Sequence, residues 1–234
     1  MILWIDQSVK RAQNKSREDG QQMNKNGSTA NKTNGDSAAR ERILKAAEEL
    51  FIESGFDGVS VNDVAVRAGV AKGLVFYYFN NKKELFDSVL DMYYTAQAGA
   101  LMGAFTSGGT VRERFHSGVD AYIDFIEKNP GWPRLIQREI CSGAKNTEKI
   151  VQYMEPLSKW GVELLSGILP GEGPTKARHF FISFFGMVIN YYTYAAVLGK
   201  LWDGDPMEAD KLRERREHIH LLLDASLDKF VSGE

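Results

Sequence analysis

The stretch from Ser60 to Lys82 constrains the fold of this chain more than any other. Its sequence is SVNDVAVRAGVAKGLVFYYFNNK. The pattern predicts two short helices joined by a tight turn at Gly69, because glycine adopts the left-handed backbone that a sharp turn requires. Asp63 follows Ser60 by three residues, which is the spacing of a capping box at the start of a helix. We therefore expect helices on both sides of Gly69.

The second of these helices has two different faces. Successive residues of an α-helix are about 100° apart, so Val75 and Phe79 fall on one side and Gly73 and Tyr77 on the other. The side chains that flank the outer face are those of Lys72, Leu74, Phe76 and Tyr78. We expect the apolar pair to anchor the helix in a core and the aromatic face to contact a partner.

Helices are also predicted before and after this stretch. Before it, Asp36 or Ser37 can cap a helix that should end at Gly55. The apolar face of that helix consists of Ile43, Leu44, Ala47, Leu50 and Phe51. After the stretch, Asn80 or Asn81 should cap a long helix that ends near the glycines at positions 108 and 109.

The rest of the chain has helical periodicity throughout. The predicted helices cover about residues 111–129, 133–142, 146–169, 176–200 and 207–230. Pro156 should kink the third of these or mark its start. The sequence contains no repeat, no Gly-rich phosphate loop and no long alternating strand pattern. The predicted fold class is all-α, with an N-terminal three-helix domain joined by a long helix to a C-terminal bundle.

The last two predicted helices are candidates for a homodimer interface. Segment 176–200 is apolar around most of its circumference, so it has to be covered partly within the protomer and partly by a second subunit. The final helix carries a further apolar stripe. The residues assigned to this interface are Phe181, Phe185, Val188, Leu222, Leu223 and Phe230.

Composition predicts three regions, namely 1–36, 37–83 and 84–234. The first is rich in Asn, Gln, Ser, Lys and Gly and lacks the apolar side chains that offset ordering entropy, so we expect a flexible arm. Its scattered basic residues alternate with acidic ones, which favours a plain leader over a nucleic-acid-binding arm.

The overall charge gives no sign of nucleic-acid binding. The net charge is −2 and the pI is about 6.1, so any DNA affinity has to come from a local basic face. Cys141 is the only cysteine, which excludes an intrachain disulfide and a cysteine-rich zinc site. No window has the length and composition of a signal peptide or a membrane span. We expect a soluble cytoplasmic protein with no membrane partner and no cofactor.

The stretch that follows Ser60 closely resembles the DNA-binding domain of the tetracycline-repressor (TetR) family. That signature has a first helix of the form T-x-x-x-I-A-x-x-A-G-V and a recognition helix that ends in Y-x-[HY]-F before a lysine. The matching residues are Ser60, Val64, Ala65, Ala68, Gly69, Val70, Phe76, Tyr78, Phe79 and Lys82. The preceding A-x-x-L-F-x-x-x-G-F, also typical of the family, matches at Ala47, Leu50, Phe51, Gly55 and Phe56. The specific match covers about residues 38–88.

The resemblance implies a homodimeric regulator, most often a repressor, that binds a palindromic operator in double-stranded DNA. A small-molecule effector in the C-terminal bundle would release the operator, and no residue would be catalytic. The DNA-contacting residues that it implies are Ser60, Val61, Asn62, Lys72, Gly73, Leu74, Phe76, Tyr77, Tyr78 and Lys82. The bland alternative is a three-helix unit whose aromatic residues merely pack.

Two residues depart from the family pattern. Phe76 stands where the family usually has Tyr, so a hydroxyl contact to phosphate is missing there. Ala71 replaces the common Ser or Pro, which removes a cap from the recognition helix. Both departures concern affinity and sequence choice rather than the type of function.

A second function class follows from two Glu-x-x-His pairs, Glu113 with His116 and Glu217 with His220. Helical bundles that hold two metal ions, as in oxidase-like proteins, use this spacing. Both pairs border charged sequence, so the favoured interpretation is solvated helix surface and no metal site.

The effector pocket is expected to be mostly apolar with few polar groups, and its ligand hydrophobic or amphipathic. The candidate lining residues are Tyr122, Arg138, Tyr153, Trp160 and Asn190. Cys141 is expected to be a small buried hydrophobe rather than a redox sensor.

Overall fold

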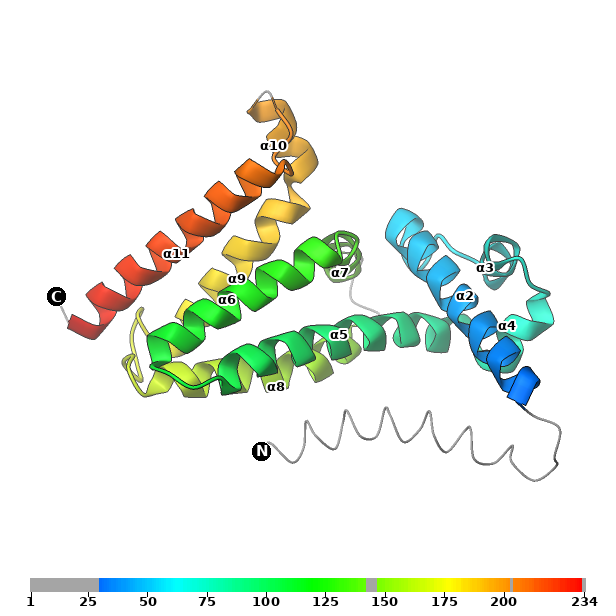
Figure 1. The fold of residues 1–234 in the computed structure, drawn as a ribbon, viewed down its shortest axis with the longest axis horizontal. Helices are drawn as coiled ribbons and strands as arrows, with labels where there is room; N and C mark the ends of the chain where they lie inside the picture. The colour runs from blue at the N-terminus through cyan, green and yellow to red at the C-terminus, as the bar shows by residue number, and fades with distance from the viewer. Residues whose placement is uncertain (1–29, 142–146, 203, 233–234) are drawn as a thin grey trace. The chain divides into compact units, whose positions relative to one another are not determined.

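The computed structural model describes residues 30–141, 147–202 and 204–232, and every regular element within them is an α-helix (Figure 1). Two compact units are present. One contains the described residues up to Leu50 together with Asp57–Val89, and the other contains Phe51–Phe56 and the described residues from Leu90 onward. The all-α prediction is confirmed.

The N-terminal unit consists of most of α2 (Ala30–Ser54), α3 (Val61–Ala68), α4 (Lys72–Tyr78) and the start of α5 (Lys82–Thr106). Its core is built from fully buried apolar side chains of all four helices, namely Ile43, Ala47, Val64, Val75, Leu85 and Phe86. Helix α2 ends where predicted, at a left-handed Gly55 with φ 72°. Asn81 begins α5, since its Oδ1 accepts a hydrogen bond from the Glu84 N–H at 2.9 Å.

The start of α2 differs from the prediction. The helix begins at Ala30 rather than at Asp36 or Ser37, so both predicted caps lie inside it. Instead of capping α2, the Asp36 carboxylate accepts a hydrogen bond from the Tyr78 hydroxyl. The predicted flexible arm lies mostly outside the described residues and stays a prediction.

The C-terminal unit is a helical bundle. Besides the rest of α5, it contains α6 (Val111–Lys128), α7 (Trp132–Cys141), α8 (Thr147–Ser166), α9 (Ala177–Thr193), α10 (Ala195–Leu201) and α11 (Ala209–Ser232). Helix α9 packs against α6, α7, α8 and α11, which places it at the centre of this unit. Thr110 and Glu113 form a capping box that starts α6. Pro156 lies within α8, and Cys141 is exposed rather than buried.

The predicted helix 176–200 is interrupted. Tyr194, with φ −91° and ψ 5°, ends α9 and precedes α10, and the two helices are bent by 69°. Neither Gly nor Pro occurs at this break, so no local signal revealed it. Within the described residues no single helix is long and apolar enough to cross a membrane, and only α9 with α10 reaches that composition as a bent pair.

Candidate functional site

The first candidate site is the surface of α4, which is positioned by Ser60 and Gly69. The Ser60 hydroxyl accepts from the Asp63 N–H at 3.2 Å, and the Asp63 carboxylate accepts from the Ser60 N–H at 2.9 Å. These bonds confirm the capping box. Hydrogen bonds from the Ser60 side chain and then from its backbone lower the pKa of Asp63 below its ordinary value. The Asp63 carboxylate is therefore charged at neutral pH and favours the N-terminus of α3.

Gly69 makes the turn between α3 and α4. Its φ of 64° and ψ of 41° lie in the left-handed region, and its N–H donates to the Val66 carbonyl oxygen at 3.2 Å. A side chain at this position would strain the backbone. Ala71 follows as the N-cap of α4 and makes no side-chain capping bond, as its sequence predicted.

Helix α4 has the two faces that the sequence predicted. Val75 and Phe79 are 1% and 2% exposed, whereas Tyr77 is 58% and Phe76 43% exposed. Lys72 and Gly73 are also exposed, and Leu74 is half-buried. The Lys72 ammonium lies 5.9 Å from the centre of the Phe76 ring, a distance at which a cation and a ring attract. The outer face of α4 thus combines one cation with two exposed aromatic rings.

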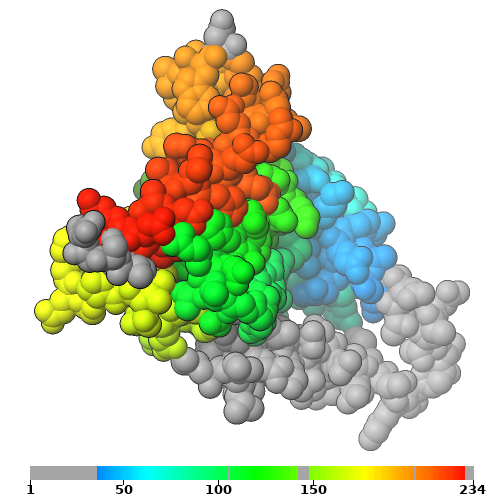
Figure 2. All heavy atoms as spheres, turned by 60° about the vertical axis from the view of Figure 1, so that its left-hand side comes forward, coloured from blue at the N-terminus to red at the C-terminus, as the bar shows by residue number. Residues whose placement is uncertain are grey.

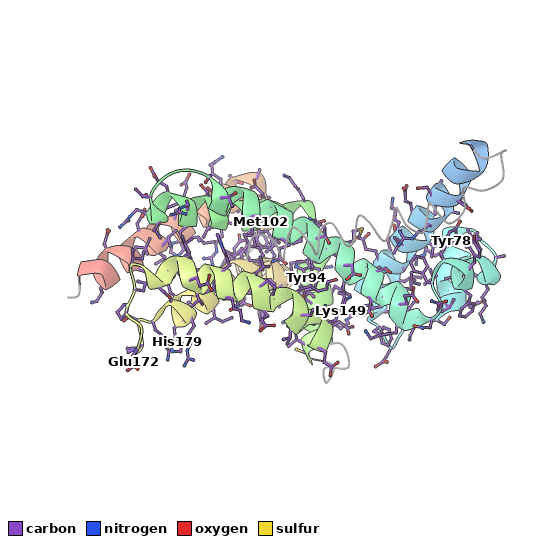
Figure 3. The ribbon with its side chains drawn as sticks, turned by 90° about the horizontal axis from the view of Figure 1, so that it is seen from below. Tyr78, Tyr94, Met102, Lys149, Glu172 and His179 are labelled. Carbon is purple, nitrogen blue, oxygen red and sulfur yellow. The ribbon has the colours of Figure 1, made fainter. Side chains whose placement is uncertain are left out.

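Two other predicted contact residues are engaged within the protein. The Tyr78 hydroxyl donates to the Asp36 carboxylate at 2.7 Å, and burial together with this bond raises the pKa of Tyr78 to about 12. Figure 3 shows Tyr78 in this unit. The Lys82 ammonium donates to the Val59 carbonyl oxygen at 3.0 Å. Sequence reasoning did not anticipate either bond, because both join segments far apart in the chain.

The remaining predicted contact residues lie at the start of α3. Ser60 and Asn62 are exposed and Val61 is half-buried. The Ser60 hydroxyl already serves the cap of α3. The structure therefore brings Ser60, Asn62, Lys72 and Tyr77 to the surface of one unit.

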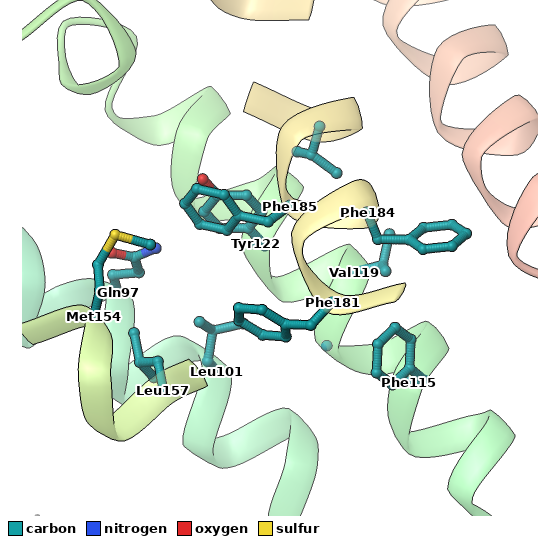
Figure 4. A pocket seen from close by; sticks show the side chains of 12 residues that line it. Gln97, Leu101, Phe115, Val119, Tyr122, Met154, Leu157, Phe181, Phe184 and Phe185 are labelled. Carbon is teal, nitrogen blue, oxygen red and sulfur yellow. The ribbon is translucent and has the colours of Figure 1, made fainter. Parts of the chain in front are cut away.

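The second candidate site is an apolar cavity of about 60 Å³ in the C-terminal bundle. Its walls come from α5, α6, α8 and α9 (Figure 4). The lining residues are Gln97, Leu101, Phe115, Gly118, Val119, Tyr122, Met154, Leu157, Phe181, Phe184, Phe185 and Val188. Within the described part of the lining, Gln97 and Tyr122 are the side chains that carry a nitrogen or oxygen atom.

The polar groups of this lining are deeply buried. Gln97 is 2% exposed, and the Tyr122 hydroxyl has no hydrogen-bond partner among the described residues. Burial, with a smaller effect of Tyr94, raises the pKa of Tyr122 well above its ordinary value. The ring of Tyr122 stacks on that of Phe185 with centroids 5.0 Å apart. A buried hydroxyl without a partner is costly, so this atom is a candidate ligand contact.

Of the five residues proposed for the effector pocket, only Tyr122 lines it. The Arg138 guanidinium lies 3.4 Å from the Ile52 carbonyl oxygen, and Asn190 is exposed. Tyr153 stacks on Tyr94 beneath the Lys149 ammonium, whose neighbourhood Figure 3 shows. Trp160 is half-buried outside the lining. The missed residues Gln97 and Met154 had no distinguishing signal in the sequence.

The proposed dimer-interface residues do not form one surface in the structure. Phe181, Phe185 and Val188 line the cavity, because α9 turns them toward α8 and α6. Leu223 is fully buried in the protomer, whereas Leu222 is 36% exposed. The side chain of Phe230 lies outside the described residues. The exposed apolar side chains of α9 and α11 include Ile182 and Leu221.

The residues of the di-metal alternative are brought together only in part. His116 and His220 are partly exposed and meet, with their Nδ1 atoms 2.6 Å apart, a contact between two helices that the sequence did not predict. Glu113 is used in the cap of α6, and Glu217 is exposed. Within the described ranges, no three or more His, Cys, Asp or Glu side chains are arranged to hold a metal ion.

Residues 43–89 match the model of the tetR family of bacterial regulatory proteins. The transcriptional activator FasR of Mycolicibacterium smegmatis is 32% identical over 97 residues, which cover 42% of this chain and 44% of FasR. The transcriptional repressor KstR2 of Rhodococcus jostii is 26% identical over 60% of this chain and 68% of its own. The chain spans less than two thirds of the first such relatives, for example 44% and 59% of two of them.

Solved structures resemble the fold over most of the chain. The fatty acid degradation regulator FadR from Bacillus halodurans aligns with a TM-score of 0.61 and 20% identity, covering 79% of this chain and 93% of its own. The family model matches residues 43–89 alone, whereas the likeness in fold covers 79% of the chain.

Proposed function

Because the chain belongs to the tetR family of bacterial regulatory proteins, we propose that it is a ligand-responsive transcription regulator that binds a palindromic operator as a homodimer. The observation that carries this proposal is the exposed face of α4. Lys72, Phe76 and Tyr77 project from a helix whose opposite face is buried. A helix of this kind fits the major groove of DNA, where side chains reach base edges.

The proposed contacts follow from the chemistry of each side chain. The Lys72 ammonium donates to guanine acceptors, and Phe76, Leu74 and Tyr77 contact thymine methyl groups. Gly73 allows close approach of the α4 backbone. The start of α3 approaches the phosphates with Ser60, Val61 and Asn62, which fixes the register on the duplex.

Tyr78 and Lys82 have a more restricted role in this proposal. The Lys82 ammonium donates to the Val59 carbonyl oxygen, so its proposed role is to attract the phosphates by its positive charge from a fixed position. The Tyr78 hydroxyl donates its hydrogen to Asp36, which leaves it to position α4 rather than to bind DNA.

The cavity in the bundle is the proposed effector site. Among the described residues that line it, the polar side chains are neutral and none is charged. A buried carboxylate would lack a counter-charge there, which is strongly unfavourable. We therefore propose a mostly apolar effector with one neutral hydrogen-bonding group, such as an ester, amide or hydroxyl, that reaches Gln97 and Tyr122.

The volume of the cavity implies a mechanism. Ligand sites usually have about 300–1,000 Å³, and the cavity has only about 60 Å³. Binding therefore requires the walls of the cavity to separate. The large side chains that would have to move are Met154 of α8 and Phe181 of α9. The proposed response is a population shift in which the opened bundle changes the spacing of the two recognition helices. Half-sites lie about 34–36 Å apart, so a small rotation loses the register.

The homodimer is proposed to form through the exposed faces of α9 and α11, with Ile182, Leu221 and Leu222 at its centre. We propose repression, the role named for KstR2, as the direction of control, although the relative FasR is named an activator. The protein would act in the cytoplasm, where its operator is. No residue is assigned a catalytic role.

The test is operator selection from a random DNA pool followed by affinity measurements on variants. Tyr77→Ala should lower affinity roughly tenfold or more, and Lys72→Ala should relax the preference for guanine at the base pair that Lys72 contacts. Tyr194→Ala is the matched control, because Tyr194 is 50% exposed but lies in the other unit. Unchanged affinity in the folded, dimeric Tyr77 variant would contradict the assignment of this face. A promoter fusion would distinguish repression from activation.

A further inference from the structure

Helices α6 and α11 carry the same spaced pattern, R-x3-H-x3-D-x3-D. On α6 the residues are Arg112, His116, Asp120 and Asp124, and on α11 they are Arg216, His220, Asp224 and Asp228. Residues four apart lie on one face of a helix, so each pattern forms a polar stripe. The two helices pack against each other, and their surfaces adjoin in Figure 2, where α6 is green and α11 red.

The two stripes pair in opposite directions. Arg112 at the start of the α6 pattern forms ion pairs with Asp224, at 2.6 Å, and with Asp228. Arg216 at the start of the α11 pattern pairs with Asp120 at 3.1 Å and with Asp124 at 2.6 Å. The helices are therefore antiparallel along this contact. Each arginine closes one end of the paired stripes.

The two histidines meet at the centre of this contact. The Nδ1 atoms of His116 and His220 are 2.6 Å apart, and the ring planes differ by only 15°. This separation is too short for stacked rings, so the imidazoles meet edge to edge. The outer Nε2 atoms lie 2.8 Å from carboxylate oxygens, His116 from Asp224 and His220 from Asp120. The result is a continuous Asp–His–His–Asp chain.

Three hydrogen bonds in this chain require three N–H groups. Ionised carboxylates only accept, so each Nε2 must carry a hydrogen, and one of the two Nδ1 atoms must donate to the other. The hydrogen bond from His116 has the largest effect on the pKa of Asp224 and lowers it. Burial opposes this effect, the bond from Arg112 adds to it, and the net lowering keeps this carboxylate an acceptor. Two neutral imidazoles carry two N–H groups and two cationic ones carry four. The three hydrogen bonds therefore require two imidazoles that share one added proton, which gives three N–H groups.

The surroundings favour that added charge. The groups that face the pair or its ends are Arg112, Arg216, Asp120, Asp124, Asp224, Asp228 and Glu127. Helix α9 contributes Tyr192, whose hydroxyl donates to Glu127 at 2.9 Å. Five carboxylates therefore face two guanidinium groups. The side chains of His116 and His220 are 25% and 22% exposed, so solvent can exchange protons with them.

A proton fits this site better than a metal ion does. Zinc binds imidazole nitrogen at about 2.0–2.1 Å, so two nitrogens in a tetrahedral site are roughly 3.4 Å apart. The Nδ1 atoms are much closer than that, and the two carboxylates lie at the outer nitrogens rather than beside the gap.

We propose that His116 and His220 together bind one proton and act as a pH-sensitive latch between α6 and α11. Loss of that proton leaves two Nδ1 lone pairs facing each other, and a second proton sets two N–H groups against each other. The latch is therefore strongest at the pH where the pair holds one added proton, and it weakens at lower and at higher pH. Its link to effector control rests on the proposed function, because Phe115, Val119 and Tyr122 of α6 line the cavity. The binding of the proton by the two histidines does not depend on the proposed function.

The first test is a ¹⁵N NMR titration of the imidazole groups in the unmodified protein. The chain has four histidines, and His179 and His218 are exposed internal references. We expect His116 and His220 to titrate in two linked steps, with three N–H groups on the pair between them. Independent single-step titration of both rings would overturn the proposal, as would stoichiometric Zn²⁺ binding by the pair.

The second test is a double-mutant cycle with H116Q and H220Q in urea unfolding. At the pH where the NMR titration shows three N–H groups on the pair, either single substitution should destabilise the protein about as much as both together, and this coupling should disappear once the added proton is lost at higher pH. The control variant H179Q/H218Q should keep the coupling unchanged. Additive effects at every pH would overturn the latch. None of these measurements uses DNA or effector, so failure here is separate from failure of the proposed function.

Discussion

Replacing Tyr122 with Phe should stabilise the protein, because it removes a buried hydroxyl that has no hydrogen-bond partner among the described residues. An unsatisfied buried polar group costs about 1–3 kcal/mol. The hydroxyl borders a small cavity, so we expect a gain near the lower end, about 1 kcal/mol. For a chain of this size that gain raises the Tm by about 2–4 °C. Calorimetry of the two proteins measures it directly.

The matched control is Tyr191→Phe. The Tyr191 hydroxyl donates to the Pro206 carbonyl oxygen at 2.8 Å in a buried position, so its removal should lower the free energy of unfolding by about 1 kcal/mol. The two substitutions delete the same atom and should act in opposite directions. In the proposed effector site, Tyr122→Phe should also weaken ligand binding up to about tenfold, the value of one hydrogen bond. A lower Tm for the Tyr122 variant would refute the reasoning about its hydroxyl.

Two further pairs of substitutions test the pocket and the α3–α4 turn. A Cβ at Gly161 would lie 2.6 Å from the Phe181 ring, so Gly161→Ala should push that ring into the cavity. A binding titration should then show reduced effector affinity. Gly103→Ala is the control, because its Cβ would meet nothing within 4 Å and affinity should not change. Gly69→Ala should destabilise the protein by about 1–2 kcal/mol in urea unfolding, because Gly69 has φ 64°. Gly73→Ala should stabilise α4 by up to about 1 kcal/mol, because open space surrounds the added methyl group. Equal effects of the two substitutions at positions 69 and 73 would contradict this account of the turn.

The parts of the fold that followed from the sequence are those with local causes. The cap at Ser60, the turn at Gly69 and the end of α2 at Gly55 each depend on residues a few positions apart. The two faces of α4 follow from helical periodicity alone, and Val75 and Tyr77 lie where that periodicity placed them. Such features need no knowledge of which helices meet.

The pocket could not be predicted in the same way, because its walls come from four helices whose pairing the sequence does not state. Apolar residues of α9 such as Phe181 and Phe185 suited a dimer interface equally well by pattern. Asn190 and Arg138 were chosen for their polarity, yet they lie outside the cavity lining. Gln97, which is buried there, sits in a helix whose pattern gave it no special role. Similarly, spacing within one helix grouped each histidine with a glutamate of its own helix. In the structure, His116 contacts Asp224 and His220 contacts Asp120, each on the other helix.

Helix α6 connects the two proposals physically, because its faces serve different neighbours. Val119 and Tyr122 line the cavity, while His116 and Asp120 on the same helix pair with α11. If a ligand opens the 60 Å³ cavity by displacing α6, the pairing of α6 with α11 has to adjust. Thermodynamic linkage then requires the converse, so a proton that strengthens the pairing must change the affinity for ligand by the same factor as ligand changes the affinity for the proton.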